Sequence, residues 1–255
     1  MLKISKYVML DIIRSKVLIA YTGFLLLVSF SLFSLESDPS KSIISLMSVV
    51  MIIVPLVSIV FSTTYFYNSY EFIELLVAQP ISRTTILLGE FFGVAVSMVL
   101  SFFAGVGIPV LVYSPNATGI ILLVSGIALT LVFVSLAFLS SVVTRDKAKG
   151  IGMSLMLWFY FSIIYDGLVL GLLFSFNDYP LEKAVIALAS LNPIDLGRIL
   201  ILLKLDLSAL MGFTGAVYKK FFGSGLGLVY SLGMMLIWMF IPMLIAVRVF
   251  RKKNL

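Results

Sequence analysis

Six long apolar segments constrain the fold of this 255-residue chain more than any other feature. Each is about as long as an α-helix must be, roughly 20 residues, to cross the hydrocarbon core of a bilayer. Helices are expected because each segment must satisfy its own backbone polar groups in lipid. We therefore predict membrane-spanning helices near residues 17–34, 43–65, 91–113, 119–143, 151–176 and 226–250.

The composition agrees with a membrane protein and narrows its chemistry. Apolar residues make up 61% of the chain and charged residues 12%, whereas about 25% of the residues of an ordinary soluble domain are charged. The chain has no cysteine and no histidine, which excludes disulfides, imidazole bases and the usual zinc sites. We predict an all-α integral membrane protein, with residues 1–255 forming a single transmembrane domain.

The basic residues predict how the chain is oriented. Lys and Arg exceed Asp and Glu by six. Of the 18 Lys and Arg residues, twelve lie in the N-terminal segment, the C-terminal tail and the loops after the second and fourth spans. The short loops on the opposite side hold Lys41 alone. Positive charge collects on the cytoplasmic side of membrane proteins. We therefore expect a multi-pass inner-membrane protein with both termini in the cytoplasm, and we assign the charge excess to topology rather than to nucleic-acid binding.

The N-terminal residues 1–16 form an amphipathic pattern. Ile4, Val8 and Ile12 share one helical stripe, while lysines and an arginine face elsewhere. This pattern favours an elbow helix that lies in the membrane interface. The alternative is a charged flank of the first span.

The segment 68–90, between the second and third spans, is too polar to cross a membrane. Its first part suits a short helix, Pro80 ends that helix, and Ser82 suits the N-cap of a helix that continues into the third span. A short amphipathic helix at this position can contact a cytoplasmic motor protein, and charged side chains can set the register of such a contact. The coupling candidates are Glu71, Glu74 and Arg83; the alternative is a solvated loop.

The long segment 177–225 is expected on the opposite, periplasmic side. Pro180, Pro193 and several glycines interrupt it. Residues 181–191 and 196–213 are apolar enough for short re-entrant or interfacial helices before the last span.

The order of these segments resembles the ABC-2-type permeases of ABC transporters. The sequence ELLVAQPISRTTILLGEFFG (residues 74–93) is similar to the family segment LL..P.sR..i..gK..g, with Glu90 where the family often has lysine. The resemblance implies a type V-like permease fold and pairing of two copies. It also implies that separate cytoplasmic ATPases bind the ATP and Mg, so this subunit itself holds no cofactor. The sequence has no G-x-x-x-x-G-K-[ST] phosphate loop, which agrees with an ATPase in a separate subunit.

Two shorter motifs resemble one branch of that family. Tyr165-Asp166-Gly167 and LNPIDLGR (residues 191–198) are similar to the permeases of Nos-type transporters, which support copper-site maturation of nitrous oxide reductase. That resemblance implies a periplasmic accessory protein built of repeats. The alternative function is an ABC-2 exporter of a lipid, polysaccharide or drug. An intramembrane enzyme is disfavoured because the chain lacks a His cluster, a Ser/Lys dyad and paired intramembrane acids. The cargo stays open between copper, a sulfur species, a lipid and none.

Asp166 is the only carboxylate well inside a predicted span. Ionisable groups at membrane depth are costly and usually face a partner or a cavity. We predict that Asp166, with Tyr165, lines the translocation path or couples the permease halves. Its expected partner is Tyr165, a hydroxyl such as Ser162, or a helix terminus; the alternative is an anchor near the outer interface.

Asn192, Asp195 and Arg198 lie around an Asn-Pro turn that opens a helix. Pro193 suits the first helical position, and Asp195 suits the positive end of the helix. A structural cap explains this motif, and docking of a periplasmic partner is the functional alternative.

The methionines Met235, Met239 and Met243 follow each other at four-residue spacing on the last span, and Met47 and Met51 do so on the second. Thioethers suit Cu(I), so the first three are candidate metal ligands. Methionine stripes at helical spacing more often serve packing, which is the alternative.

Overall fold

The structure, a computed structural model, describes residues 1–36, 38–176, 182–204 and 225–252. All elements within these ranges are helical, and six helical segments among them are long and apolar enough to cross a membrane. The predicted fold class is confirmed, and each span lies within a few residues of its predicted position or extends beyond it.

The spans are numbered along the chain, with η denoting a π-helical turn. They are α2 (Lys16–Leu35), α3 (Pro39–Asn68), α5–η1–α6 (Arg83–Phe102, Phe103–Gly107 and Ile108–Tyr113), α7 (Ala117–Val143), α8–η2–α9 (Lys147–Phe159, Tyr160–Ile164 and Tyr165–Ser175) and α13 (Gly225–Lys252). The shorter helices are α1 (Leu2–Ile13), α4 (Tyr70–Val77), α10 (Glu182–Ser190) and α11 (Pro193–Lys204). The part of the predicted helix 196–213 after Lys204 lies outside the described residues.

Local sequence sets several helix starts. The Ser82 hydroxyl accepts a hydrogen bond from the Thr85 backbone N–H (3.3 Å), which confirms the predicted N-cap of α5. Asn116 and Asp146 cap α7 and α8 in the same way, each through a side-chain oxygen 2.9 Å from the backbone nitrogen three residues on. Such caps satisfy backbone donors that a helix start otherwise leaves unpaired.

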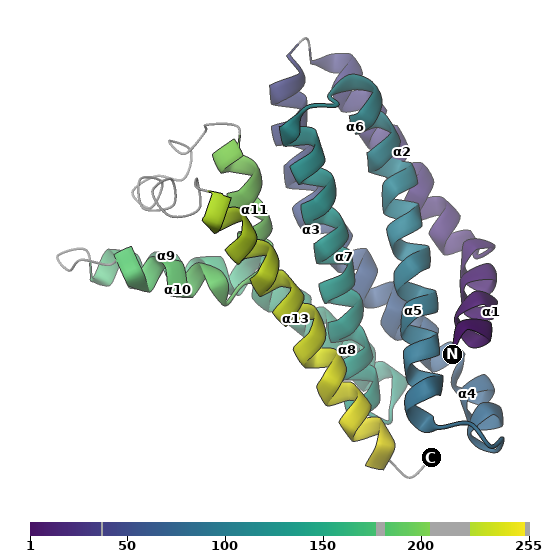
Figure 1. The fold of residues 1–255 in the computed structure, drawn as a ribbon. Coiled ribbons are helices and arrows are strands. Elements are labelled where there is room, and N and C mark those ends of the chain that lie inside the picture. The colour runs from purple at the N-terminus through teal and green to yellow at the C-terminus, as the bar shows by residue number, and fades with distance from the viewer. Residues whose placement is uncertain (37, 177–181, 205–224, 253–255) are drawn as a thin grey trace.

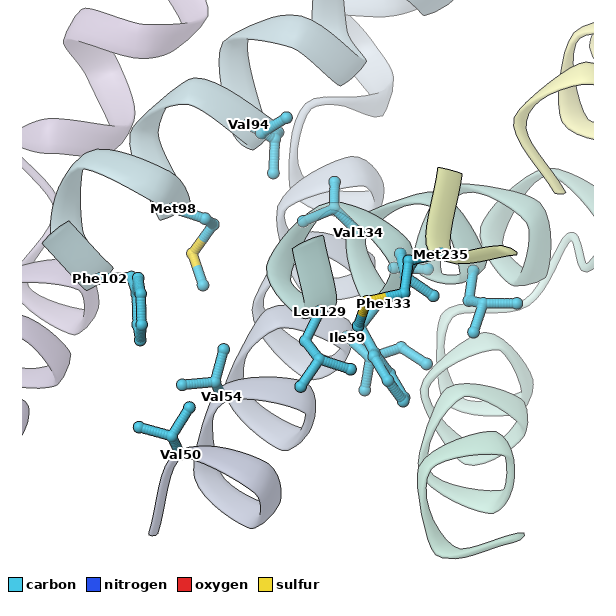
Figure 2. Packing of buried hydrophobic residues seen from close by; sticks show 14 of the residues in the cluster. Val50, Val54, Ile59, Val94, Met98, Phe102, Leu129, Phe133, Val134 and Met235 are labelled. Carbon is cyan, nitrogen blue, oxygen red and sulfur yellow. The ribbon is translucent and has the colours of Figure 1, made fainter. Parts of the chain in front are cut away.

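The core lies between α3, α5 and α7. Apolar side chains such as Val54, Met98 and Leu129 fill the space between these three helices (Figure 2). Within the most apolar window of each span, 67% of the residues of α7 are buried, against 11% for α8–η2–α9 and 22% for α13. The third and fourth spans therefore hold the centre, and the last two spans lie at its edge.

A chain of hydroxyl groups fastens α3, α7 and α8 to one another. Thr63 Oγ1 and Ser154 Oγ are 2.6 Å apart, and Ser154 Oγ is also 2.6 Å from Ser140 Oγ. All three side chains are buried. Hydroxyl contacts of this kind join helices in an apolar environment, where no water competes for the hydrogen bonds.

The α1 helix packs closely against α5. Val8 and Ile12 are fully buried, as the amphipathic stripe predicts. A Cβ added at Gly93 would lie 2.6 Å from Val8 Cβ and 3.0 Å from the Ser5 carbonyl oxygen, so only glycine allows this approach. Glu90, in the same stretch of α5, is also fully buried. Contact between α1 and the membrane interface stays a prediction.

We expect Gly93→Ala to loosen α1 from α5 and to lower the free energy of unfolding by about 1–3 kcal/mol, the usual cost of overpacking. Thermal unfolding of the purified chain in detergent measures the effect. Gly23→Ala is the matched control, because a Cβ at Gly23 meets nothing within 4 Å. Equal melting temperatures for the two variants would contradict the close packing of α1 and α5.

The fifth span bends. Figure 1 shows α8 lying in the bundle and α9 extending away from it sideways, with the π-helical turn η2 between them. A π turn adds a residue to a helix and often marks a functional site. The same view places α1, α4 and the C-terminal end of α13 toward one end of the molecule, and α6 toward the other.

Candidate functional site

The structure brings together two motifs that are 32 residues apart in the sequence. Asp166 stands in the first turn of α9, just beyond the bend of the fifth span, and it meets Arg198 of α11. Asn192 and Asp195, at the start of α11, complete the group. We call Asp166, Asn192, Asp195 and Arg198 the polar junction.

Asn192 fixes the start of α11. Its Oδ1 accepts a hydrogen bond from the Ile194 backbone N–H (3.0 Å), and Pro193 occupies the first helical position, where a missing N–H costs nothing. The predicted structural cap is therefore present. The side chain is also fully buried. Its amide has further hydrogen-bond partners on the fifth span and on α11, which make this burial tolerable.

The amide of Asn192 ties α11 to the bend. Its Nδ2 donates to the Phe161 carbonyl oxygen (3.0 Å) inside η2, and also to Asp195 Oδ2 (3.1 Å). A π turn displaces the backbone from the regular helical hydrogen-bond ladder, which makes a carbonyl available to an outside donor. The bend and the cap of α11 thus depend on each other.

Arg198 bridges two carboxylates. Its Nη1 donates to Asp166 Oδ2 (3.0 Å) and to Asp195 Oδ1 (3.1 Å). Asp195 and Arg198 lie three residues apart on one helix face, whereas Asp166 comes from another span. One guanidinium therefore holds the fifth span and α11 together.

The expectation that Tyr165 or Ser162 partners Asp166 is wrong. The Tyr165 hydroxyl donates to the Leu188 carbonyl (2.6 Å), and the Ser162 hydroxyl has no hydrogen-bond partner in the part of the chain that the structure describes. Asp166 does begin a helix, but η2 runs directly into it, and the hydrogen-bond donor is Arg198. The reason is tertiary: the bend of the fifth span brings a cation of α11 to the carboxylate.

The junction carries two carboxylates and one guanidinium. The side chains of Arg198 and Asp166 are 36% and 31% exposed, and that of Asp195 is 16% exposed. Burial raises the pKa of Asp195 above its usual range, the Asp166 carboxylate acts in the same direction, and Arg198 and Asn192 oppose the shift. The protonated form of Asp195 is therefore favoured more than in a free aspartate.

Aromatic residues connect the junction to the last span. Trp238 Nε1 donates to the Ser190 carbonyl (3.1 Å), and the Ser190 hydroxyl lies 2.8 Å from the Tyr230 hydroxyl. The Phe161 and Trp238 rings meet edge to face with centroids 5.2 Å apart. The sequence reasoning missed these residues, because no local pattern marks a contact that depends on the bend at η2.

The coupling candidates lie on and beside α4. Glu71 and Glu74 are exposed on this helix, while Ile73 and Leu76 are buried beneath it. Arg83 opens α5 and is half-buried. The predicted short amphipathic helix is therefore present and ends before the Pro80 turn. Contact with a motor protein stays a prediction.

The methionine candidates are packed inside the bundle or against it. Met235 and Met243 are buried and Met239 is half-buried. A Cβ at Gly197 would lie 3.3 Å from the Met51 methyl and 3.5 Å from the Met235 methyl. These methyl groups therefore line the seat of α11 and serve packing there, and metal binding by the three candidates stays a prediction.

Comparison with known proteins gives two findings. The family model described as ABC-2 family transporter protein matches residues 2–255. Two curated relatives carry the name probable ABC transporter permease protein NosY. The one from Pseudomonas aeruginosa is 28% identical over 67% of this chain and 66% of its own length. The one from Stutzerimonas stutzeri is 26% identical over 83% of this chain and 80% of its own length.

Proposed function

Since this chain belongs to the ABC-2 transporter family, it is a transmembrane permease subunit of an ABC transporter, and we propose that it is a Nos-type permease. In this proposal the chain lies in the inner membrane with both termini in the cytoplasm. It passes motion that is driven by a separate ATPase to the periplasmic side, for copper-site maturation of nitrous oxide reductase. The names of the two relatives support this assignment.

The input of this mechanism is α4. Its acidic side chains Glu71 and Glu74 are exposed, and its apolar side is anchored by Ile73 and Leu76. Phe72 also stacks on Tyr7 of α1, with ring centroids 5.3 Å apart. A helix packed in this way moves together with the helices that it contacts, so it can transmit a displacement to them. The ATPase binds the ATP and Mg, and this subunit supplies the surface on which it acts.

The output is the polar junction, and the bridge from Arg198 to both Asp166 and Asp195 is the observation that carries this part of the proposal. The bridge joins the bent fifth span to the external segment, so a shift of span five moves α11. Asp166 acts as a coupling residue in this scheme. Asn192, Asp195 and Arg198 hold the shape of the face on which a periplasmic accessory protein docks.

We propose further that two copies of the chain pair. The fifth span supports this, because only 11% of its most apolar window is buried within one chain. Exposed apolar residues such as Met156, Ile163 and Leu168 lie along α8, η2 and α9. Mass measurement of the purified complex tests pairing, and a mass corresponding to one copy would contradict it.

The maturation role is tested in a host whose own Nos-type permease has been deleted. Co-expression of this chain with its ATPase and periplasmic partners should restore copper to nitrous oxide reductase, measured by metal analysis and by the visible absorption of the purified enzyme. A reductase that stays without copper while the complex assembles and hydrolyses ATP would overturn the Nos assignment. It would instead favour an exporter of a lipid, polysaccharide or drug.

A further inference from the structure

A shallow groove lies where α7 and α13 end together, toward the same end of the molecule as α4 (Figure 1). It encloses about 350 Å³. Its walls are the two last residues of α7, the loop that follows, and the final turn of α13: Val142, Val143, Arg145, Val249 and Lys252.

The groove combines two kinds of surface. Three valines form an apolar wall, and Val143 is 50% exposed. Arg145 and Lys252 add two positive charges, and none of the described residues that line the groove is acidic. Within the described part of the chain neither cation has an ion pair. Asp146 is the neighbour of Arg145 in the sequence. Its Oδ1 accepts a hydrogen bond from the Lys149 backbone N–H (2.9 Å) and so caps α8.

We propose that this groove binds an anionic phospholipid, with the headgroup phosphate between Arg145 and Lys252 and an acyl chain against the valines. Basic pockets between spanning helices recognise such headgroups. The position of the groove agrees with a lipid headgroup site. Both α7 and α13 have the length and composition of membrane spans, and both end at the groove. A free phosphate ion would leave the valine wall unused, whereas a lipid uses both surfaces.

Native mass spectrometry of the full-length chain, released from detergent, tests the proposal. Phosphatidylglycerol and phosphatidylcholine with identical acyl chains serve as probes. We expect retention of phosphatidylglycerol in preference to phosphatidylcholine. The double variant Arg145→Gln/Lys252→Gln should weaken phosphatidylglycerol binding by about ten- to thirty-fold, since each cation near an anionic surface contributes about five-fold.

The matched control is Arg248→Gln/Arg251→Gln. It removes the same charge from the exposed side of the last two turns of α13 and leaves the groove lining intact. Phosphatidylglycerol binding within about two-fold of wild type is expected for this control. Equal losses in both double variants would overturn the site in favour of general attraction, as would equal retention of the two lipids by the wild-type chain.

A third variant separates a lipid from a free anion. Val143→Asn should weaken phosphatidylglycerol binding, because it makes the apolar wall polar, and inorganic phosphate at millimolar concentration should not displace the lipid. Displacement by phosphate together with unchanged binding by Val143→Asn would overturn the lipid assignment. Every changed side chain is exposed, so we expect all of these variants to fold. Melting temperatures near that of the wild-type chain verify that the fold is intact.

Discussion

Replacing Arg198 by alanine is expected to weaken the coupling between the fifth span and α11 strongly. The substitution leaves Asp166 and Asp195 facing each other without the guanidinium that now bridges them. An unbalanced charge in a fully buried site costs several kcal/mol. These groups are partly exposed, so we expect a loss of about 1–2 kcal/mol in the free energy of unfolding. The loss of function should be larger, at least about ten-fold.

Two measurements check this expectation. Thermal unfolding in detergent reports the stability of the chain, and copper loading of the reductase reports coupling. A double-mutant cycle with Asp166→Asn isolates the pair, because the cost of Asp166→Asn should shrink once Arg198 is absent. Arg198→Lys is the conservative control, which keeps the charge and removes the planar guanidinium.

Wild-type stability and maturation in Arg198→Ala would remove the bridge from the mechanism. Asp166→Asn gives a second, independent check, because it keeps the side-chain shape and removes only the charge. Unchanged ATPase activity and unchanged maturation in this variant would show that Asp166 is neither part of the path nor a coupling residue.

Reversing the charge of α4 is expected to separate the permease from its ATPase. Glu71 and Glu74 lie three residues apart on one exposed helix face. Glu71→Lys/Glu74→Lys places two cations where the partner surface meets two anions, and like charges across an interface cost several kcal/mol. The variant itself should fold normally, because both side chains are exposed and the anchoring residues Ile73 and Leu76 are unchanged.

Co-purification of the ATPase with the tagged permease measures the effect. We expect at least about a ten-fold loss of bound ATPase. Glu36→Lys is the control: Glu36 is also exposed and acidic, but it follows α2. The C-terminal end of α2 lies at the end of the molecule away from α4 (Figure 1). Full retention of the ATPase by the α4 double variant would refute the coupling assignment, and loss in both variants would show that the effect is not local.

The sequence alone predicts most of the fold, since the governing signals are local. A run of about 20 apolar residues predicts a span wherever it stands in the chain, and all six predicted spans are helices in the structure. The N-cap at Ser82 and the structural cap at Asn192 were predictable for the same reason. A capping side chain bonds to backbone within three residues, so tertiary contacts are not needed to find it.

The candidate site was predictable only in its parts. Asp166 and Arg198 each stood out, the first as an acid inside a span and the second beside an Asn-Pro turn. The pairing of Asp166 with Arg198 was not predictable. Tyr165 and Ser162, the partners expected for Asp166, were wrong. Sequence reasoning placed Arg198 in a separate external segment, whereas the structure seats α11 beside the bend of the fifth span.

The sequence by itself therefore determined the helical membrane architecture, the caps and the exposed acidic helix α4, because each depends on neighbours within a few residues. Only the tertiary structure decided the bend at η2, the seat of α11 and the bridge through Arg198. The physical reason is that the Phe161 carbonyl meets the Asn192 amide, and Asp166 meets Arg198, across 31 and 32 residues of chain. No local pattern specifies contacts of that range.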